Sequence, residues 1–147
     1  MIGLPTWEAT TDVVVVGSGV AGLTAALDLA VAGLTAVVVT KGAADDSSTQ
    51  WAQGGVAVVR DERDPGDSVQ AHIADTLVAG AGLADPAAVE LILTEGPAAV
   101  SRLIARGALF DTGPDGLLRT REGGHSANRV IHAGGDATGA ERSEDVV

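Results

Sequence analysis

The chain has no cysteine and almost no aromatic side chains. Its 147 residues include no tyrosine, one phenylalanine and two tryptophans. The lack of cysteine excludes a disulfide framework, a thiolate metal site and a cysteine nucleophile, and it suits a reducing compartment. So few aromatic rings leave no row of platforms on which the bases of single-stranded nucleic acid stack. The 46% of residues that are hydrophobic are enough for the core of one domain, built from aliphatic side chains.

Charge and the length of the hydrophobic runs restrict the partners. Twenty acidic and nine basic side chains give a net charge of -11, which repels phosphate backbones and anionic lipid surfaces. We therefore expect neither nucleic acid nor a membrane as a partner. The first residues do not follow the signal-peptide pattern, and no apolar run approaches the ~18 residues of a membrane span. We expect a cytoplasmic protein, in which a bound anion needs local help from backbone N–H groups.

The first forty residues predict a βαβ unit, which makes the expected fold class α/β and Rossmann-like. Residues 12–16 contain four consecutive valines, a pattern typical of a strand buried on both faces of a parallel sheet. A second strand of the same kind is expected over 36–39. Between them a helix is expected over 20–32, with Gly33 as its C-terminal cap. One face of this helix carries Leu23, Leu27 and Val31.

The remaining chain predicts additional helices, short strands and long loops. A polar, glycine-rich loop is expected over 41–55. Gly96-Pro97 is expected to break one helical region into two helices, because proline interrupts the helical hydrogen bonds. The other expected segments are a strand at 56–59, a helix capped by Asp67 or Ser68, a helix start at Asp85-Pro86, a helix end at Gly107, an irregular segment at 111–116 and a strand at 129–133.

A glycine-rich motif lies between the first strand and the first helix. Its sequence, Gly17-Ser18-Gly19-Val20-Ala21-Gly22, has the form G-x-G-x-x-G. These glycines permit a tight turn, the approach of backbone to a pyrophosphate, and close packing of helix on strand. The motif in this position predicts a dinucleotide site. The acid that often binds a ribose about twenty residues later is absent. Thr40 and Lys41 stand there, and spacing alone leaves Lys41 as either a surface lysine or a nucleotide contact, with NAD and FAD both open.

Longer motifs resemble a known family. The stretch STQWAQGG at residues 48–55, after a dinucleotide βαβ unit, resembles the flavoprotein family of succinate dehydrogenases, fumarate reductases and L-aspartate oxidases. Four later stretches are similar to the L-aspartate oxidase branch, and the resemblance extends from about Asp12 to Gly139. These stretches are HIADTLVAGAGLADPAAVELI, RLIARGALFD, TREGGHS and RVIHAGGDATG.

The resemblance implies FAD as the cofactor. It implies that the pyrophosphate binds at Ser18 to Ala21, that Lys41 lies near the adenosine side, and that Asp136 lies in a D-x-T-G stretch close to the FAD. Ser48 stands where the succinate dehydrogenase branch has a histidine bonded to the flavin, which implies non-covalent FAD. Without the family, the loop over 48–55 is interpreted as an ordinary connection. The residues implied to lie along the flavin are Ser48, Thr49, Gln50, Trp51, Ala52, Gln53, Gly54 and Gly55.

The stretch TREGGHS contains the candidate substrate residues. From the residues alone, Glu122 is either a solvated loop acid or a ligand for a cation. The resemblance implies that Glu122 orients the α-ammonium of L-aspartate, because the succinate and fumarate branch has an uncharged residue there. His125, beside it, is a second candidate substrate residue, whereas His72 and His132 are expected to be structural. No two histidines have the spacing of a zinc motif, so no metal site is expected.

The implied activity is oxidation of L-aspartate to iminoaspartate, with oxygen or fumarate as the acceptor. In the family this is the first step of NAD biosynthesis, and quinolinate synthase is the implied partner. A soluble fumarate reductase and a non-catalytic nucleotide-binding fragment are the alternatives. Members of the family are several times longer, and residues 140–147 depart from their pattern. We therefore expect residues 1–147 to be the N-terminal part of an FAD-binding domain, without the substrate-capping and C-terminal helical domains and inactive by itself.

Overall fold

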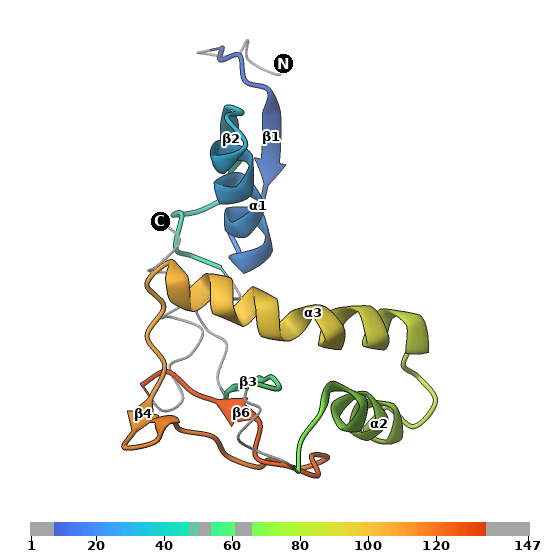
Figure 1. The fold of residues 1–147 in the computed structure, drawn as a ribbon. Coiled ribbons are helices and arrows are strands. Elements are labelled where there is room, and N and C mark those ends of the chain that lie inside the picture. Colours follow the sequence, from blue (N-terminus) through green and yellow to red (C-terminus); the bar gives the residue numbers. More distant parts are fainter. Residues whose placement is uncertain (1–7, 48, 50–53, 61–65, 135–147) are drawn as a thin grey trace.

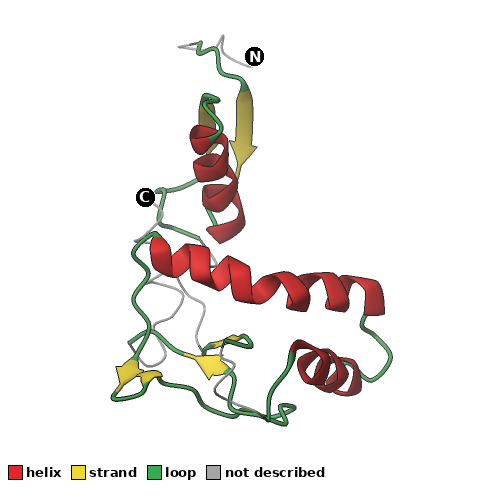
Figure 2. Cartoon of the chain, viewed as in Figure 1, coloured by secondary structure: helices red, strands yellow, loops and turns green. Residues whose placement is uncertain are grey.

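The computed structural model describes residues 8–47, 49, 54–60 and 66–134, and Figure 1 shows a small βαβ unit standing on a larger second part. In the second part a long helix lies between the βαβ unit and a layer of short strands and one further helix (Figure 2). In chain order the elements are β1 (Val13–Val16), α1 (Val20–Val31), β2 (Ala36–Val39), β3 (Val56–Ala57), α2 (Val69–Ala79), α3 (Pro86–Ala105), β4 (Thr112–Gly113), β5 (Gly116–Leu117) and β6 (Val130–Ile131).

The predicted βαβ unit is present. Strands β1 and β2 pair in parallel, from Val13 opposite Ala36 to Val16 opposite Val39. The Asp12 carboxylate accepts hydrogen bonds from the Thr35 hydroxyl at 2.7 Å and the Thr35 backbone N–H at 2.8 Å. These bonds lower the pKa of Asp12, and they hold the starting ends of the two strands together. Because the two strands are parallel, the carboxyl ends of both face α3 (Figure 1).

The prediction that these strands are buried on both faces is wrong for the described residues. Val14 is 58% exposed and Val16 is 84% exposed, whereas Val13 and Val15 are half-buried. Successive side chains of a strand point to opposite faces, and α1 packs on one face of this two-stranded sheet. Val31, placed by its spacing on the inner face of α1, is also 84% exposed because it lies at the end of the helix.

The hydrophobic core lies in the second part of the molecule. Strands β3 and β6 pair antiparallel, with Val56 opposite Ile131, and Ile131 is fully buried. Helix α3 contributes Val100 to this core, and α2 packs beside α3. The strands thus carry the packing surface, although each is only two residues long. The buried cluster consists of Val58, Val100, Ala108, Phe110, Ile131 and Ala133, with Val56, Leu103, Ile104 and Leu117 packed against it.

Helix α3 is continuous, so the predicted break at Gly96-Pro97 is wrong. Its start is as expected, because the Asp85 carboxylate caps it by accepting from the Ala87 N–H at 2.9 Å and Pro86 occupies the first turn. Pro97 lies inside the helix. Gly96 has no Cβ to clash with the proline ring, which reduces the strain of helical backbone before Pro97, and the helix continues with one hydrogen bond missing.

Of two other predicted segments, the cap of α2 is confirmed and the irregular segment is corrected. Helix α2 starts after Ser68, whose hydroxyl accepts from the Ala71 N–H at 3.0 Å, while Asp67 is used elsewhere. The segment expected to be irregular forms a β4–β5 hairpin, with Thr112 opposite Leu117. Among the described helices, none combines the length and hydropathy that crossing a bilayer requires.

Candidate functional site

The glycine motif forms a tight loop, here called the phosphate loop (residues 17–22), between β1 and α1. Gly17 has a positive φ of 109°, a conformation that side chains disfavour, and its N–H donates to the Val39 carbonyl at 2.9 Å. A Cβ added at Gly22 would collide with the carbonyl oxygen of Gly17. Gly17 and Gly22 therefore have the steric reasons that the motif predicts.

Thr49 joins the phosphate loop although it lies 29 residues after Val20. The Val20 N–H, in the first turn of α1, donates to Thr49 Oγ1 at 3.1 Å. A Cβ added at Gly19 would lie 3.3 Å from the same oxygen. The structure thus brings a residue of the predicted flavin loop to the start of α1, where free N–H groups and the helix dipole favour an anion.

A cleft of about 450 Å³ opens at the carboxyl ends of β1 and β2. The hydroxyl of Ser18, a residue only 4% exposed, donates to Thr40 Oγ1 at 3.2 Å across the two strand ends. Predicted cofactor residues from three separate segments meet here. The lining residues are Val16, Gly17, Ser18, Gly19, Val39, Thr40, Lys41, Asp46, Ser47 and Thr49.

The cleft fits the diphosphate of a dinucleotide. Ser47 Oγ is buried and has no hydrogen-bond partner among the described residues, so it is free to serve a polar ligand. Asp46 also lines the cleft, where its carboxylate would repel a diphosphate, and neither Asp46 nor Ser47 was among the predicted site residues. The signal that could have identified them is a run of hydrogen-bonding residues in a loop that follows the second strand of a dinucleotide βαβ unit.

The other predicted flavin residues divide into two groups. Gly54 and Gly55 are described, and Gly55 packs tightly against β6. A Cβ there would collide with Val130 and would lie 2.9 Å from Cε1 of His132. The packing of Gly55 against β6 therefore requires a glycine at this position, independently of any bound cofactor. Ser48, Gln50, Trp51, Ala52, Gln53 and Asp136 lie outside the described residues.

The candidate substrate residues lie on loop 121–129, between β5 and β6. Reciprocal hydrogen bonds between the backbones of Thr120 and Val130, at 2.9 and 3.0 Å, close its base. Glu122 is half exposed, and its Oε1 lies 3.4 Å from Nε2 of His132. Thr120 Oγ1 lies 3.0 Å from the same nitrogen. Glu122 is therefore held beside β6, with His132 as its neighbour.

A buried ion cluster fastens loop 121–129 to α2. Arg129, with 0% of its side chain exposed, donates two hydrogen bonds to Asp67, at 2.7 and 3.2 Å, and one to Asp75 at 2.6 Å. Asp75 Oδ2 also accepts from the Ser126 N–H and hydroxyl, both at 2.7 Å. We call Asp67, Asp75, Ser126 and Arg129 the Arg129 cluster. The sequence analysis treated Arg129 only as the start of a strand, because nothing local indicates its partners.

Electrostatics in this region follow from burial and charge. The Ser126 N–H and hydroxyl, with Arg129, hold the pKa of Asp75 well below its usual range. Burial opposes the charge of Arg129, but hydrogen bonds to Asp67 and Asp75 outweigh it and raise the pKa of Arg129. Burial, followed by the charge of Arg129, lowers the pKa of His72, which is 3% exposed. The rings of His72 and His125 lie 5.5 Å apart.

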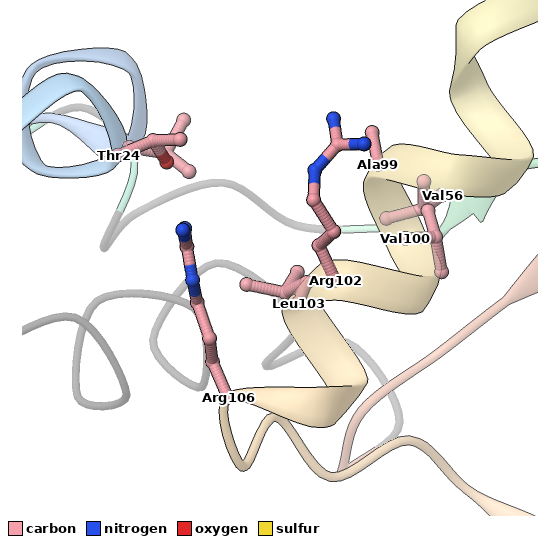
Figure 3. A pocket seen from close by; sticks show the side chains of 8 residues that line it. Thr24, Val56, Ala99, Val100, Arg102, Leu103 and Arg106 are labelled. Atoms are coloured by element: carbon pink, nitrogen blue, oxygen red, sulfur yellow. The ribbon is translucent and has the colours of Figure 1, made fainter. Parts of the chain in front are cut away.

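A second hollow, of about 170 Å³, lies between α1 and α3 (Figure 3). Its floor is apolar, and Arg102 and Arg106 extend from α3 at its side. Arg106 contacts the Asp28 carboxylate of α1 at 2.5 Å, which ties the βαβ unit to α3. None of the predicted substrate residues lines this hollow.

Comparison with known proteins identifies the family. The chain belongs to the FAD-binding domain family, whose model matches residues 12–143, and FAD is accordingly its cofactor. It is 61% identical over 144 residues to the L-aspartate oxidase of Streptomyces coelicolor, covering 97% of this chain and 24% of that protein. The L-aspartate oxidase of Mycobacterium tuberculosis is 54% identical over 139 residues, covering 93% of this chain and 26% of that protein. The chain thus spans about a quarter of the length of these relatives.

Solved structures share the fold. The Mycobacterium smegmatis Sdh1 complex aligns with a TM-score of 0.86 at 38% identity, covering 92% of this chain and 23% of that chain. A quinol fumarate reductase of E. coli aligns with a TM-score of 0.83 at 29% identity, with the same two coverages. The predicted α/β fold class, the FAD cofactor and the resemblance to L-aspartate oxidases are confirmed.

Proposed function

We propose that this chain is the cofactor-binding portion of an FAD-dependent L-aspartate oxidase. The observation that carries the proposal is Glu122, a half-exposed carboxylate on a loop anchored at both ends, in a chain 61% identical to an L-aspartate oxidase. Among the substrates considered, only aspartate has an ammonium group for that carboxylate to bind.

One group of residues in the chain binds the cofactor, and another orients the substrate. The phosphate loop holds the diphosphate through backbone N–H groups, which supply local positive potential in an acidic protein, and the Thr49 hydroxyl lies beside them on the Val20 N–H. Lys41 lines the same cleft, and we assign it to the adenosine side. When bound, FAD supplies the redox chemistry by accepting a hydride from Cα of aspartate, which leaves iminoaspartate. Oxygen or fumarate then takes the electrons.

Glu122 orients the substrate so that Cα is presented for this transfer. A carboxylate beside an ammonium forms a charge-assisted contact that succinate cannot form. Both charges lose water on pairing, so the contact mainly selects the substrate. We place His125 beside it as a second polar group for the substrate.

The proposal includes the remaining flavin contacts and the fate of the product. Residues 48–55 line the flavin, Asp136 supports it, and Ser48 makes the FAD non-covalent, since serine cannot form the bond that the histidine of succinate dehydrogenases forms. Iminoaspartate is labile, so we propose quinolinate synthase as the partner that receives it. We propose the cytoplasm as the location of both proteins.

A chimera tests the proposed function. The matched 144 residues of this chain would replace their counterpart in the Streptomyces coelicolor relative. We expect a yellow protein that forms peroxide with aspartate, while the 147-residue chain alone forms none because substrate positioning tolerates little misplacement. A chimera that retains FAD and reduces fumarate but never oxidises aspartate would instead favour the fumarate reductase alternative, which the E. coli structure supports at 29% identity.

A further inference from the structure

Arg129 is the most deeply buried charge in the described part of the chain, and it lies outside the cofactor cleft. Its side chain is 0% exposed, and its partner Asp67 is 3% exposed. The cluster contains two carboxylates and one guanidinium, although a single carboxylate would be enough to neutralise the charge of Arg129. Burying such groups costs free energy that the pairing often only offsets, so a buried ionic cluster contributes more to a unique geometry than to stability.

The geometry that this cluster fixes is that of loop 121–129. Asp75 of α2 accepts from both the backbone and the hydroxyl of Ser126, while Arg129 donates at 3.4 Å to the same hydroxyl. Gly124, with φ of 83°, brings the loop against the end of α2, where an added Cβ would lie 3.4 Å from Cβ of Ala79. The loop is therefore held to α2 at its middle and its end, in addition to the closed base.

Arg129 also determines the protonation pattern of His125. Its Nη1 lies 3.4 Å from Nδ1 of His125. A guanidinium only donates, so Nδ1 must accept and carries no proton. A neutral His125 ring then has its proton on Nε2, which becomes a donor. The groups around this ring are Arg129, the buried His72 and, through Arg129, the two carboxylates.

We propose that Arg129 is a positioning residue of the substrate site: it holds loop 121–129 on α2 and keeps His125 as the Nε2–H tautomer, a donor for a substrate carboxylate. This assignment rests on the proposed function for its substrate. It divides the recognition of an amino dicarboxylate between two residues of one loop, with Glu122 for the ammonium and His125 for a carboxylate.

One arm of the test needs no catalysis. Nitrogen NMR of the histidine-labelled 147-residue chain, with peaks assigned by single His→Gln substitutions, reports the tautomer of each ring. We expect a protonated Nε2 and a bare Nδ1 for His125. A protonated Nδ1 would overturn the proposal, and this measurement stands even if no variant of Arg129 folds.

The second arm uses the FAD-loaded chimera. Arg129→Lys keeps the charge but cannot reach both carboxylates and His125 together, because lysine lacks the planar fork of arginine. We expect KM for aspartate to rise about tenfold with kcat nearly unchanged, since uniform binding is lost and not chemistry. Asp75→Asn, at a position 19% exposed, should raise KM in the same direction while FAD content stays constant.

Arg106→Lys is the matched control. It alters the other described arginine–aspartate pair, which joins α3 to α1 away from loop 121–129. We expect its KM to be that of the parent chimera. Unchanged KM in both Arg129→Lys and Asp75→Asn would contradict the positioning role. A parent chimera without aspartate oxidation would instead refute the proposed function, and the tautomer of His125 would still decide the role of Arg129.

Discussion

Oε1 of Glu122 lies 3.4 Å from Nε2 of His132, the nitrogen that also lies 3.0 Å from the hydroxyl of Thr120. The ring of His132 thus lies between the Thr120 hydroxyl and the Glu122 carboxylate. His132 in turn lies beside Gly55, because a Cβ added at Gly55 would be 2.9 Å from Cε1 of the His132 ring. The relationship links a predicted substrate residue to a predicted flavin residue through β6.

Replacing Glu122 tests its role as the ammonium ligand. In the chimera, Glu122→Gln should reduce kcat/KM for aspartate by about 100-fold, the scale of a lost charged contact. Fumarate reduction should remain, because fumarate has no ammonium group. Steady-state rates for both substrates check this, and equal losses would mean that Glu122 is a structural loop acid.

Replacing His132 tests whether Glu122 needs its neighbour. His132→Gln retains an N–H donor, whereas His132→Leu removes it at similar bulk. We expect aspartate kcat/KM to fall by about tenfold in the leucine variant and by less in the glutamine variant, since one polar contact with a charged group is lost. The fumarate rate serves as the internal control. A leucine variant as active as glutamine would mean that the donor is not used.

The phosphate loop can be tested by a graded pair of substitutions. Gly19→Ala adds a Cβ 3.3 Å from Thr49 Oγ1, while Gly19→Asp adds both bulk and negative charge where the diphosphate binds. FAD content, measured from the flavin absorbance after purification, should fall in the alanine variant and vanish in the aspartate variant. Full FAD retention by Gly19→Asp would refute this position for the diphosphate.

The pH dependence of stability should report on His72. Its pKa is lowered from 6.5, mainly by burial, so the unfolded chain binds more protons below that pH. The contribution of neutral His72 to the free energy of unfolding is complete above pH 6.5 and is lost as the pH falls toward the pKa of His72 in the folded chain. Urea unfolding should show a free energy that decreases from about pH 7 to about pH 5 in the parent chain and less so in His72→Gln.

Asp75 affects the pH dependence of stability over a separate, more acidic pH range. Its pKa is lowered from 3.8, so its contribution is present above that value and is lost only as the pH falls below it. An identical slope between pH 5 and 7 in the parent and in His72→Gln would therefore show that His72 is not the group responsible.

The location of the core gives a prediction about stability. Ile131 is 0% exposed, so Ile131→Ala should lower the free energy of unfolding by about 2–5 kcal/mol through lost burial and a cavity. Val31→Ala, at a position 84% exposed, should change it by only about 0.5 kcal/mol. Similar effects of the two substitutions would mean that the core does not lie around β6.

Local sequence determined the βαβ unit and its phosphate loop. Valine runs, helical spacing and glycines act within about thirty residues, and the conformations that they permit are few. The caps at Ser68 and Asp85 are equally local, since each side chain bonds to N–H groups two or three residues later. The break predicted at Gly96-Pro97 was wrong, because the helix tolerates the hydrogen bond that proline removes and continues through Pro97.

Only the tertiary structure decided which distant groups meet. Thr49 reaches Val20 across 29 residues, and Arg129 reaches Asp67 across 62, and no periodicity encodes either pairing. The resemblance to a family pointed to Glu122, but its contact with His132 depends on the Thr120–Val130 bridge that folds one segment onto the other. Short-range sterics and hydrogen bonds can be read along the chain, whereas contacts between distant side chains exist only after the packing of β6, α2 and α3 brings them together.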